Sequence, residues 1–247
     1  MALVLPRERL IVAIAGLLDG VRHVAVGASS PIPAAGAMLL RALAERDGKP
    51  RVRISILGSR EHNFFTNGSA ELFDCAGQGR IDAFFLGGGQ IDGGANINLV
   101  GIDGYPKSRV RFPGSFGSAF MYYVVPRVIL FSVEHSPRVM VPRVDFVSAP
   151  GTSPAGVYRP GGPYALVTSR CVFRFEPDIG RFSLHSVHPG QTVDGIRAHT
   201  GFDFDARADI DVTPAPTAEE LALIRGALAA DISETYQAFA KSVLEAS

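Results

Sequence analysis

The chain has 247 residues, of which 47% are hydrophobic, and its 24 lysines and arginines balance 24 aspartates and glutamates. A net charge of zero gives no electrostatic signature of a nucleic-acid or membrane-surface partner, and we expect neither. No apolar run approaches the roughly 20 residues that a membrane-spanning helix needs. The length suits one large domain or two small ones, and we predict a single domain over residues 1–247.

Helix and strand patterns alternate in the first part of the chain. Residues 7–19 fit a helix with one apolar face, and residues 21–26 fit a strand. Residues 33–46 favour a helix with proline in its first turn, and residues 51–57 alternate as a strand does. The order helix, strand, helix, strand indicates a parallel sheet with helices on its faces.

A glycine-rich stretch follows at residues 81–119, after a short predicted helix at 70–77. Its apolar strand at 83–86 runs directly into three glycines. Glycine lets the backbone approach a ligand closely, and open α/β sheets bind ligands beyond the carboxyl ends of their strands. A tight turn would explain the glycines equally well. The residues that we expect to line a binding site are Gly88, Gly89, Gln90 and Asn96, together with Gly114, Ser115 and Gly117 of a second small-residue loop.

The second half of the chain reads mostly as short strands. Strand-like runs occupy residues 127–135 and 144–148, and a meander is predicted over 164–169, 171–175 and 181–187. A short helix at 193–199 begins after Thr192. A long helix is predicted from 218 to 246, because Thr217 and Glu220 have the spacing of a capping box.

The two cysteines and six histidines give no sign of a metal site. Cys75 and Cys171 lie in apolar stretches and match neither a metal spacing nor a disulfide framework. The histidines are scattered, without the close spacing typical of metal ligands. We therefore expect no metal. Reduced thiols, and an N-terminal apolar run too short for a convincing signal peptide, favour a cytoplasmic location.

The order of several motifs resembles that of the B (beta) subunit of family I CoA-transferases, of the glutaconate CoA-transferase type. Each motif is weak alone, and together they span most of the chain. The segments that carry the resemblance are residues 26–31, 87–92 (GGGQID), 94–98 (GANIN), 106–117, 144–151 (VDFVSAPG), 164–168, 188–190 (HPG) and 200–203 (TGFD).

This resemblance implies an α/β fold: an open, mostly parallel sheet flanked by helices in three α/β/α layers, with a C-terminal β-meander and helix. It also implies a partner A (alpha) subunit, and coenzyme A as a substrate with no further cofactor. In such transferases a glutamate attacks the acyl-CoA thioester, and the CoA passes through a glutamyl-CoA thioester to a free carboxylate. Backbone N–H groups of a glycine loop would stabilise the oxyanion.

The nucleophile is where the sequence departs from the family pattern. The family's glutamate ends the strand that is predicted here at 51–57, but this chain has Ile56-Leu57-Gly58-Ser59 at that place. Glu61, about three residues later, is the candidate nucleophile, and a solvated loop residue is the alternative. The departure keeps two other readings open: the B subunit of a steroid-type acyl-CoA ring-opening hydrolase, and a non-catalytic subunit that completes an acyl-CoA-binding interface.

Overall fold

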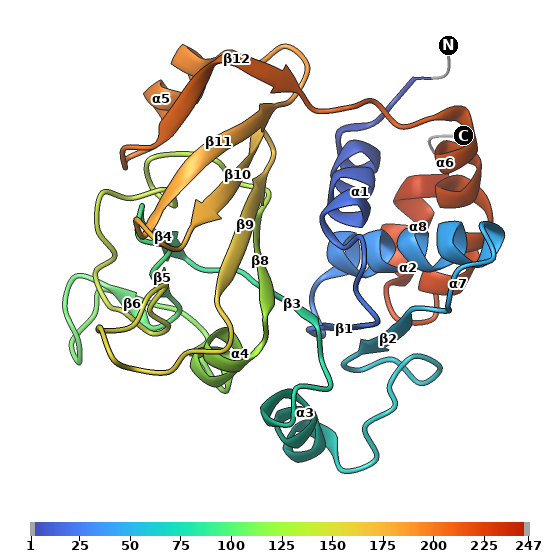
Figure 1. The fold of residues 1–247 in the computed structure, drawn as a ribbon, viewed down its shortest axis with the longest axis horizontal. Coiled ribbons are helices and arrows are strands. Elements are labelled where there is room, and N and C mark those ends of the chain that lie inside the picture. Colours follow the sequence, from blue (N-terminus) through green and yellow to red (C-terminus); the bar gives the residue numbers. More distant parts are fainter. Residues whose placement is uncertain (1–2, 245–247) are drawn as a thin grey trace. The chain divides into compact units, whose positions relative to one another are not determined.

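The computed structural model describes residues 3–244, which group into two compact units (Figure 1). Unit 1 is assigned residues 1–85 and 214–247, and unit 2 is assigned residues 86–213. Unit 1 is thus assembled from the two ends of the chain, with unit 2 inserted between them. The assignment of residues 1–247 to a single domain stays a prediction, and each unit is described by itself.

Unit 1 is built on three parallel strands. β1 (His23–Val26) pairs with β2 (Arg53–Ile56) on one side and with β3 (Ala83–Leu86) on the other. All four residues of β1 are buried, as expected for a parallel strand that is covered on both faces. The predicted order of parallel strands and helices is therefore confirmed for this part of the chain.

Three helices accompany these strands: α1 (Pro6–Leu17), α2 (Pro31–Arg46) and α3 (Gly68–Gly77). α1 packs against α2, and α2 packs against β1 and β2. Gly36 makes the contact between the two helices close, because a Cβ atom there would lie only 2.5 Å from Ile14 Cγ2. A side chain at position 36 would therefore push the two helices apart.

The C-terminal part of unit 1 departs from the single helix predicted over 218–246. The capping box is confirmed: Thr217 Oγ1 accepts from the N–H of Glu220, and Glu220 accepts from the N–H of Thr217. The helix is then interrupted by a π-helical turn and by a non-helical turn, and residues 245 and 246 lie outside the described range. The observed elements are α6 (Ala218–Leu223), η1 (Ile224–Leu228), α7 (Ala229–Ile232) and α8 (Gln237–Leu244).

Five strands of unit 2 pair side by side in the order β8-β9-β10-β11-β12. The predicted meander is confirmed, because β9, β10 and β11 pair antiparallel in sequence order. β8 pairs in parallel with β9, and β12, which the sequence did not suggest, pairs in parallel with β11. The bounds are β8 (Arg127–Ser132), β9 (Pro163–Thr168), β10 (Cys171–Glu176), β11 (Arg181–Val187) and β12 (Asp205–Val212).

An aromatic cluster fills the core beside this sheet. The Phe173 ring lies 5.0 Å from that of Phe204, 5.8 Å from that of Phe182 and 6.0 Å from that of Phe202, measured between centroids.

The predicted α5 (Val193–His199) is confirmed, with Thr192 as its N-cap. The remaining elements are short: β4 (Gln90–Ile91), β5 (Ile97–Asn98), β6 (Gly101–Ile102), β7 (Val110–Arg111) and α4 (Ser118–Val124). Together the two units confirm the α/β fold class. Among the described residues no helix has the length and apolar character needed to cross a membrane.

The two thiols differ in accessibility, and this difference can be measured. Cys171 is buried, and burial raises the pKa of its thiol to about 12, whereas Cys75 is partly exposed. Because the thiolate is the reactive form, we expect iodoacetamide at neutral pH to label Cys75 in the native protein and Cys171 only after unfolding. Mass spectrometry of tryptic peptides checks this, and rapid native labelling of Cys171 would contradict the burial.

Candidate functional site

The candidate nucleophile Glu61 lies in a loop at the carboxyl end of β2. The loop is tight: the N–H of Ile56 donates to the carbonyl of His62 at 2.8 Å, and the N–H of Ser59 donates to the carbonyl of Ile56 at 3.1 Å. The neighbouring residues Ser59 and His62 are buried, whereas Glu61 is exposed. The loop thus presents one carboxylate to its surroundings at the edge where α/β sheets bind ligands.

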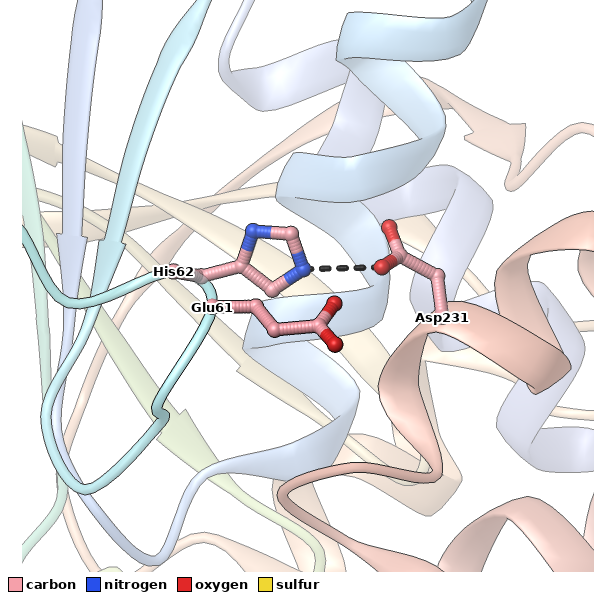
Figure 2. Close-up of side chains that lie close together, drawn as sticks. All are labelled: Glu61, His62 and Asp231. Atoms are coloured by element: carbon pink, nitrogen blue, oxygen red, sulfur yellow. Dashed lines mark hydrogen bonds and ion pairs between the residues drawn. The ribbon is translucent and has the colours of Figure 1, made fainter.

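His62 and Asp231 form a pair beside this carboxylate (Figure 2). The Nε2 atom of His62 lies 2.8 Å from Oδ1 of Asp231, a residue of α7. The second carboxylate oxygen of Asp231 accepts a hydrogen bond from Arg41 of α2 at 2.9 Å. Asp231 therefore fixes the orientation of the imidazole ring, and Arg41 in turn fixes Asp231.

Glu61, His62 and Asp231 carry side chains of the kinds that bind divalent cations. One ligand atom each from Glu61, His62 and Asp231 lies within 4.8 Å of the others, and carboxylate and imidazole are ligands that zinc accepts. The charge of Asp231 is already compensated by Arg41, and His62 Nε2 already has a hydrogen-bonding partner. The cluster is therefore satisfied as an ion-pair and hydrogen-bond network, and no metal is needed to explain its geometry.

The predicted glycines of the first loop lie in unit 2, where they make close contacts with their own chain. A Cβ atom at Gly88 would lie 2.5 Å from Ile97 Cγ2, and one at Gly89 would lie 2.2 Å from the Phe112 ring. The N–H of Gly89 donates to the carbonyl of Asn98 at 2.9 Å. A Cβ atom at Gly88 would also lie 2.8 Å from the backbone carbonyl oxygen of Gln90, so packing requires glycine there, whereas a side chain at position 89 would displace the Phe112 ring.

Gln90 belongs to a buried hydrogen-bond network. Its amide nitrogen donates to Asp145 at 2.5 Å, and its amide oxygen accepts from Asn98 Nδ2 at 2.7 Å and from the N–H of Asp145 at 3.0 Å. The side chain of Asn98 also accepts from the N–H groups of Val100 and Gly101. These amides therefore shape the loop, and a role of Gln90 in ligand binding stays a prediction.

The side chain of Asn96 is also hydrogen-bonded within the chain. Its side-chain nitrogen donates to the carboxylate of Asp92, and its oxygen accepts from the N–H of Gly151 at 3.1 Å. Position 151 requires glycine, because a Cβ atom there would lie 2.1 Å from the carbonyl oxygen of Gly94. Two of the segments that suggested the resemblance are thus packed directly against each other.

This packing explains why the strand predicted at 144–148 is wrong. The segment contains bends and its groups are paired: the N–H and hydroxyl of Ser148 both donate to the carbonyl of Ile97. Val144 donates to Asp92, and Ala149 forms an isolated bridge with Ile97. Side chains of the glycine loop satisfy much of the backbone here, so no regular ladder forms.

The second predicted loop, with Gly114, Ser115 and Gly117, leads into α4. Gly114 has a positive φ of 104°, and its N–H already donates to the carbonyl of Leu99 at 2.9 Å. The carbonyl of Ser115 accepts from the N–H of Ser118, and Gly117 is the N-cap residue of α4. An oxyanion would therefore have to be bound by N–H groups beyond Gly114.

A pocket of about 500 Å³ opens in unit 2 beside Asn96. This volume is within the range of small-molecule sites. Asp92 and Asn96 face each other there, and Arg181 is paired with Asp205 at 3.0 Å. The pocket is lined by Asp92, Gly93, Gly94, Asn96, Pro142, Gly180, Arg181, Gly201, Phe202 and Asp203.

His135 is a buried histidine that serves the fold. Its two ring nitrogens lie 2.7 Å and 2.9 Å from the hydroxyls of Thr168 and Thr200. Burial, with the nearby charge of Arg170, lowers the pKa of His135 to about 4. The ring is therefore neutral at physiological pH and links strand β9 to the end of α5.

Comparison with known proteins agrees with this fold. A model of the coenzyme A transferase family matches residues 55–199, which is more than half of the sequence, and the chain belongs to the coenzyme A transferase family. The match includes the loop with Glu61 and both glycine loops, and it ends before the C-terminal elements of unit 1.

Three curated relatives share about a third of their aligned residues with the chain. It is 33% identical over 153 residues to the B subunit of a 3-oxoadipate CoA-transferase from Pseudomonas knackmussii, covering 60% of this chain and 58% of the relative. It is 30% identical to the B subunit of the glutaconate CoA-transferase from Acidaminococcus fermentans (57% and 54% covered). It is 32% identical to the IpdB subunit of a cholesterol ring-cleaving hydrolase from Rhodococcus jostii (64% and 63% covered). The chain thus aligns with less than two thirds of each relative, and the predicted resemblance to B subunits is confirmed.

Solved structures match over a larger part of the chain. The crystal structure of IpdAB from Rhodococcus jostii RHA1 superposes with a TM-score of 0.75 at 26% identity, covering 90% of this chain and 94% of that one. The decarboxylase AibA/AibB superposes with a TM-score of 0.74 at 25% identity and the same coverage. The fold of this family is thus found together with more than one kind of reaction.

Proposed function

We propose that the chain is the B subunit of a heteromeric CoA-transferase, which moves CoA between an acyl-CoA thioester and a free carboxylate. Membership of the coenzyme A transferase family supports this proposal, as do two relatives whose names are those of transferase B subunits. The partner would be an A subunit, and the substrates an acyl-CoA and a carboxylate. The reaction uses no cofactor besides the coenzyme A that is transferred, and free thiols favour the cytoplasm.

The single observation that carries the proposal is the placement of Glu61. Its carboxylate is exposed at the carboxyl end of β2, in a loop that is fixed on both sides. In the proposed reaction Glu61 attacks the thioester carbonyl and releases the CoA thiolate, which leaves an acyl-glutamyl anhydride. The thiolate then attacks the glutamyl carbonyl and releases the acyl carboxylate, which leaves a glutamyl-CoA thioester. The acceptor carboxylate finally takes the CoA along the reverse route.

The glycine loops of unit 2 would hold the acyl-CoA. Gly88, Gly89, Gln90 and Asn96 shape the first loop, and N–H groups in the Ser115–Gly117 turn are the proposed oxyanion donors. Removing one such donor typically lowers the rate by about 10²–10³-fold. Side chains of the chain itself crowd the first loop. The loop would therefore contribute to acyl-CoA binding through its backbone groups and through its rigidity.

The covalent intermediate gives the direct test. The chain, copurified with its partner, is incubated with an acyl-CoA and treated with borohydride, and the Glu61 peptide is examined by mass spectrometry. We expect Glu61 to be found reduced to the alcohol, and we expect ping-pong kinetics with 3-oxoadipate or glutaconate as trial acceptors. Full activity of the chain without any partner would contradict its assignment as a subunit.

A hydrolase is the second candidate, because one relative is named a ring-cleaving hydrolase subunit and no glutamate stands at the very end of β2. In that case the chain helps to hold the CoA thioester, water opens a ring of the acyl group, and the acidic residue that directs the water belongs to the partner. The same experiment separates the two candidates. Hydrolysis without an acceptor, and without any adduct on this chain, favours the hydrolase, and no turnover with any acyl-CoA favours a non-catalytic subunit.

A further inference from the structure

The C-terminal turn of unit 1 contacts the two loops that follow β1 and β2. Glu234 accepts from the Ser59 hydroxyl at 2.7 Å and from the N–H of Arg60 at 2.8 Å, one bond to each carboxylate oxygen. The hydroxyl of Tyr236 donates to the carbonyl of Gly27 at 3.1 Å. Residues from the end of the chain thus hold the edge of the sheet that carries Glu61.

These bonds fix the chain on both sides of Glu61. Glu234 binds Ser59 and the backbone of Arg60, and Asp231 binds the ring of His62 at 2.8 Å. The loop is also closed on itself, since the N–H of His62 donates to Ser59 Oγ at 2.8 Å. The exposed carboxylate of Glu61 therefore stands between two anchored positions of the loop.

We propose that Asp231 and Glu234 are positioning residues that together hold the loop of residues 59–62 in the geometry that Glu61 needs for attack. This proposal rests on the proposed function of Glu61. Neither acid touches the reacting atoms in this role. Both lie beyond the region that the family model matches, which ends at residue 199.

These hydrogen bonds preorganise the loop before the substrate binds. A carboxylate that accepts from a hydroxyl and an amide makes charge-assisted hydrogen bonds, which are stronger than neutral ones. Hydrogen bonds from Thr235, from Ser59 and from the N–H of Arg60 lower the pKa of Glu234, so its carboxylate is ionised at neutral pH. A misplacement of about 1 Å at a reacting group can lower the rate by about 10²-fold. Loss of the two positioning acids should therefore affect turnover more than it affects substrate binding.

The test compares graded variants of Glu234 and Asp231 in the copurified enzyme. We expect Glu234→Ala to lower kcat by about 10–100-fold with KM for acyl-CoA nearly unchanged, because the loop loses two anchors. Glu234→Gln keeps one oxygen acceptor and should recover part of the rate. Asp231→Asn keeps the shape of the side chain and weakens its hold on His62, and it should lower kcat as well.

Two measurements separate positioning from a general loss of structure. Glu219→Ala removes an exposed acid of the neighbouring helix α6, which pairs with Arg46, and we expect no change in kcat. The rate of glutamyl-CoA formation in a single turnover should fall in Glu234→Ala while the thermal midpoint and the copurification of the partner stay near those of the parent. Should Glu234→Ala fail to fold, Glu234→Gln and Ser59→Ala replace it, with the same expected direction.

The outcomes distinguish this proposal from the one on which it rests. If Glu61→Gln abolishes turnover while Asp231→Asn and Glu234→Ala retain the parent kcat, the positioning role is wrong and the nucleophile stands. If Glu61→Gln retains full turnover, the nucleophile itself is wrong. If kcat and KM change together with the thermal midpoint and partner binding, the two acids are structural only, and the positioning role is overturned.

Discussion

Replacing Glu61 by glutamine is expected to lower transferase turnover by about 10³-fold or more, since losing a nucleophile removes the covalent route altogether. Glutamine preserves the size and polarity of the side chain, but its amide cannot form the anhydride with the acyl group. Glu61 is exposed, so the substitution should leave the thermal midpoint unchanged. Steady-state transfer of CoA from an acyl-CoA to a carboxylate, measured by chromatography of the CoA esters, checks the prediction.

Glu45→Gln is the matched control for this variant. Glu45 also belongs to unit 1 and is exposed, and it pairs with Arg51 at 2.8 Å, away from the loop of Glu61. Full turnover is expected for Glu45→Gln. A Glu61→Gln enzyme with parental turnover would show that Glu61 is not the nucleophile of the transfer, which would then use a carboxylate outside this loop.

The parallel core of unit 1 could be predicted because each of its strands and helices has a recognisable pattern within its own short segment. β1 and β2 are short apolar or alternating runs with a glycine within two residues of their ends, and helices connect the strands. Burial on both faces requires such apolar runs. The partners of Glu61 lacked any local signal: Asp231 lies 169 residues from His62 in the sequence. An acidic residue in a helical segment usually faces water, and only the fold brings this one to the loop.

In the C-terminal region, the helical sequence pattern is insufficient to predict where the helix ends. Alanine and leucine are strong helix formers, and they predict one helix from 218 to 246. The structure inserts the π-turn η1 at Ile224–Leu228 and ends α7 at Ile232. The helical path continues through η1 into α7, and the turn that carries Glu234 and Tyr236 follows the end of α7. A helix continued past Ile232 would have removed this turn.

The glycine loops were found in the sequence, but their internal bonding was not. The sequence predicts that Gln90 and Asn96 bind a ligand. In the structure their side chains are hydrogen-bonded to Asp145 and Asp92. Gln90 and Asp145 are 55 residues apart, so no sequence pattern predicts their pairing, whereas Asp92 and Asn96 are only 4 residues apart. Buried polar groups must be bonded, and here that requirement ties the loop to the segment at 144–151.

A second large effect is expected for stability, at Glu8 in α1. Its side chain is fully buried, and its two oxygens accept from Nε and a terminal nitrogen of Arg225 at 2.6 Å and 2.9 Å. The N–H of Leu5 donates to the same carboxylate at 2.8 Å. Glu8→Ala leaves Arg225 Nε and the N–H of Leu5 without this acceptor, whereas the terminal nitrogen of Arg225 keeps the carbonyl of Leu3. Leaving buried donors unsatisfied costs about 1–3 kcal/mol of unfolding free energy. Urea unfolding at neutral pH checks this value.

The exposed pair of Glu134 and Arg138 is the control for that measurement, because it is largely in water and Glu134→Ala should cost far less.

The pH dependence of the stability gives an independent check on Glu8. Burial alone would raise the pKa of Glu8, but the hydrogen bonds from Arg225 and Leu5 outweigh burial and lower it from 4.5. A lowered pKa in the folded state stabilises the protein above the unfolded value and stops doing so as the pH falls through the folded value. The stability gap between the parent and Glu8→Ala should therefore be constant from pH 7 down to about pH 5.5 and shrink below pH 4.5. A gap that widened on acidification would show that Glu8 is not held as a carboxylate.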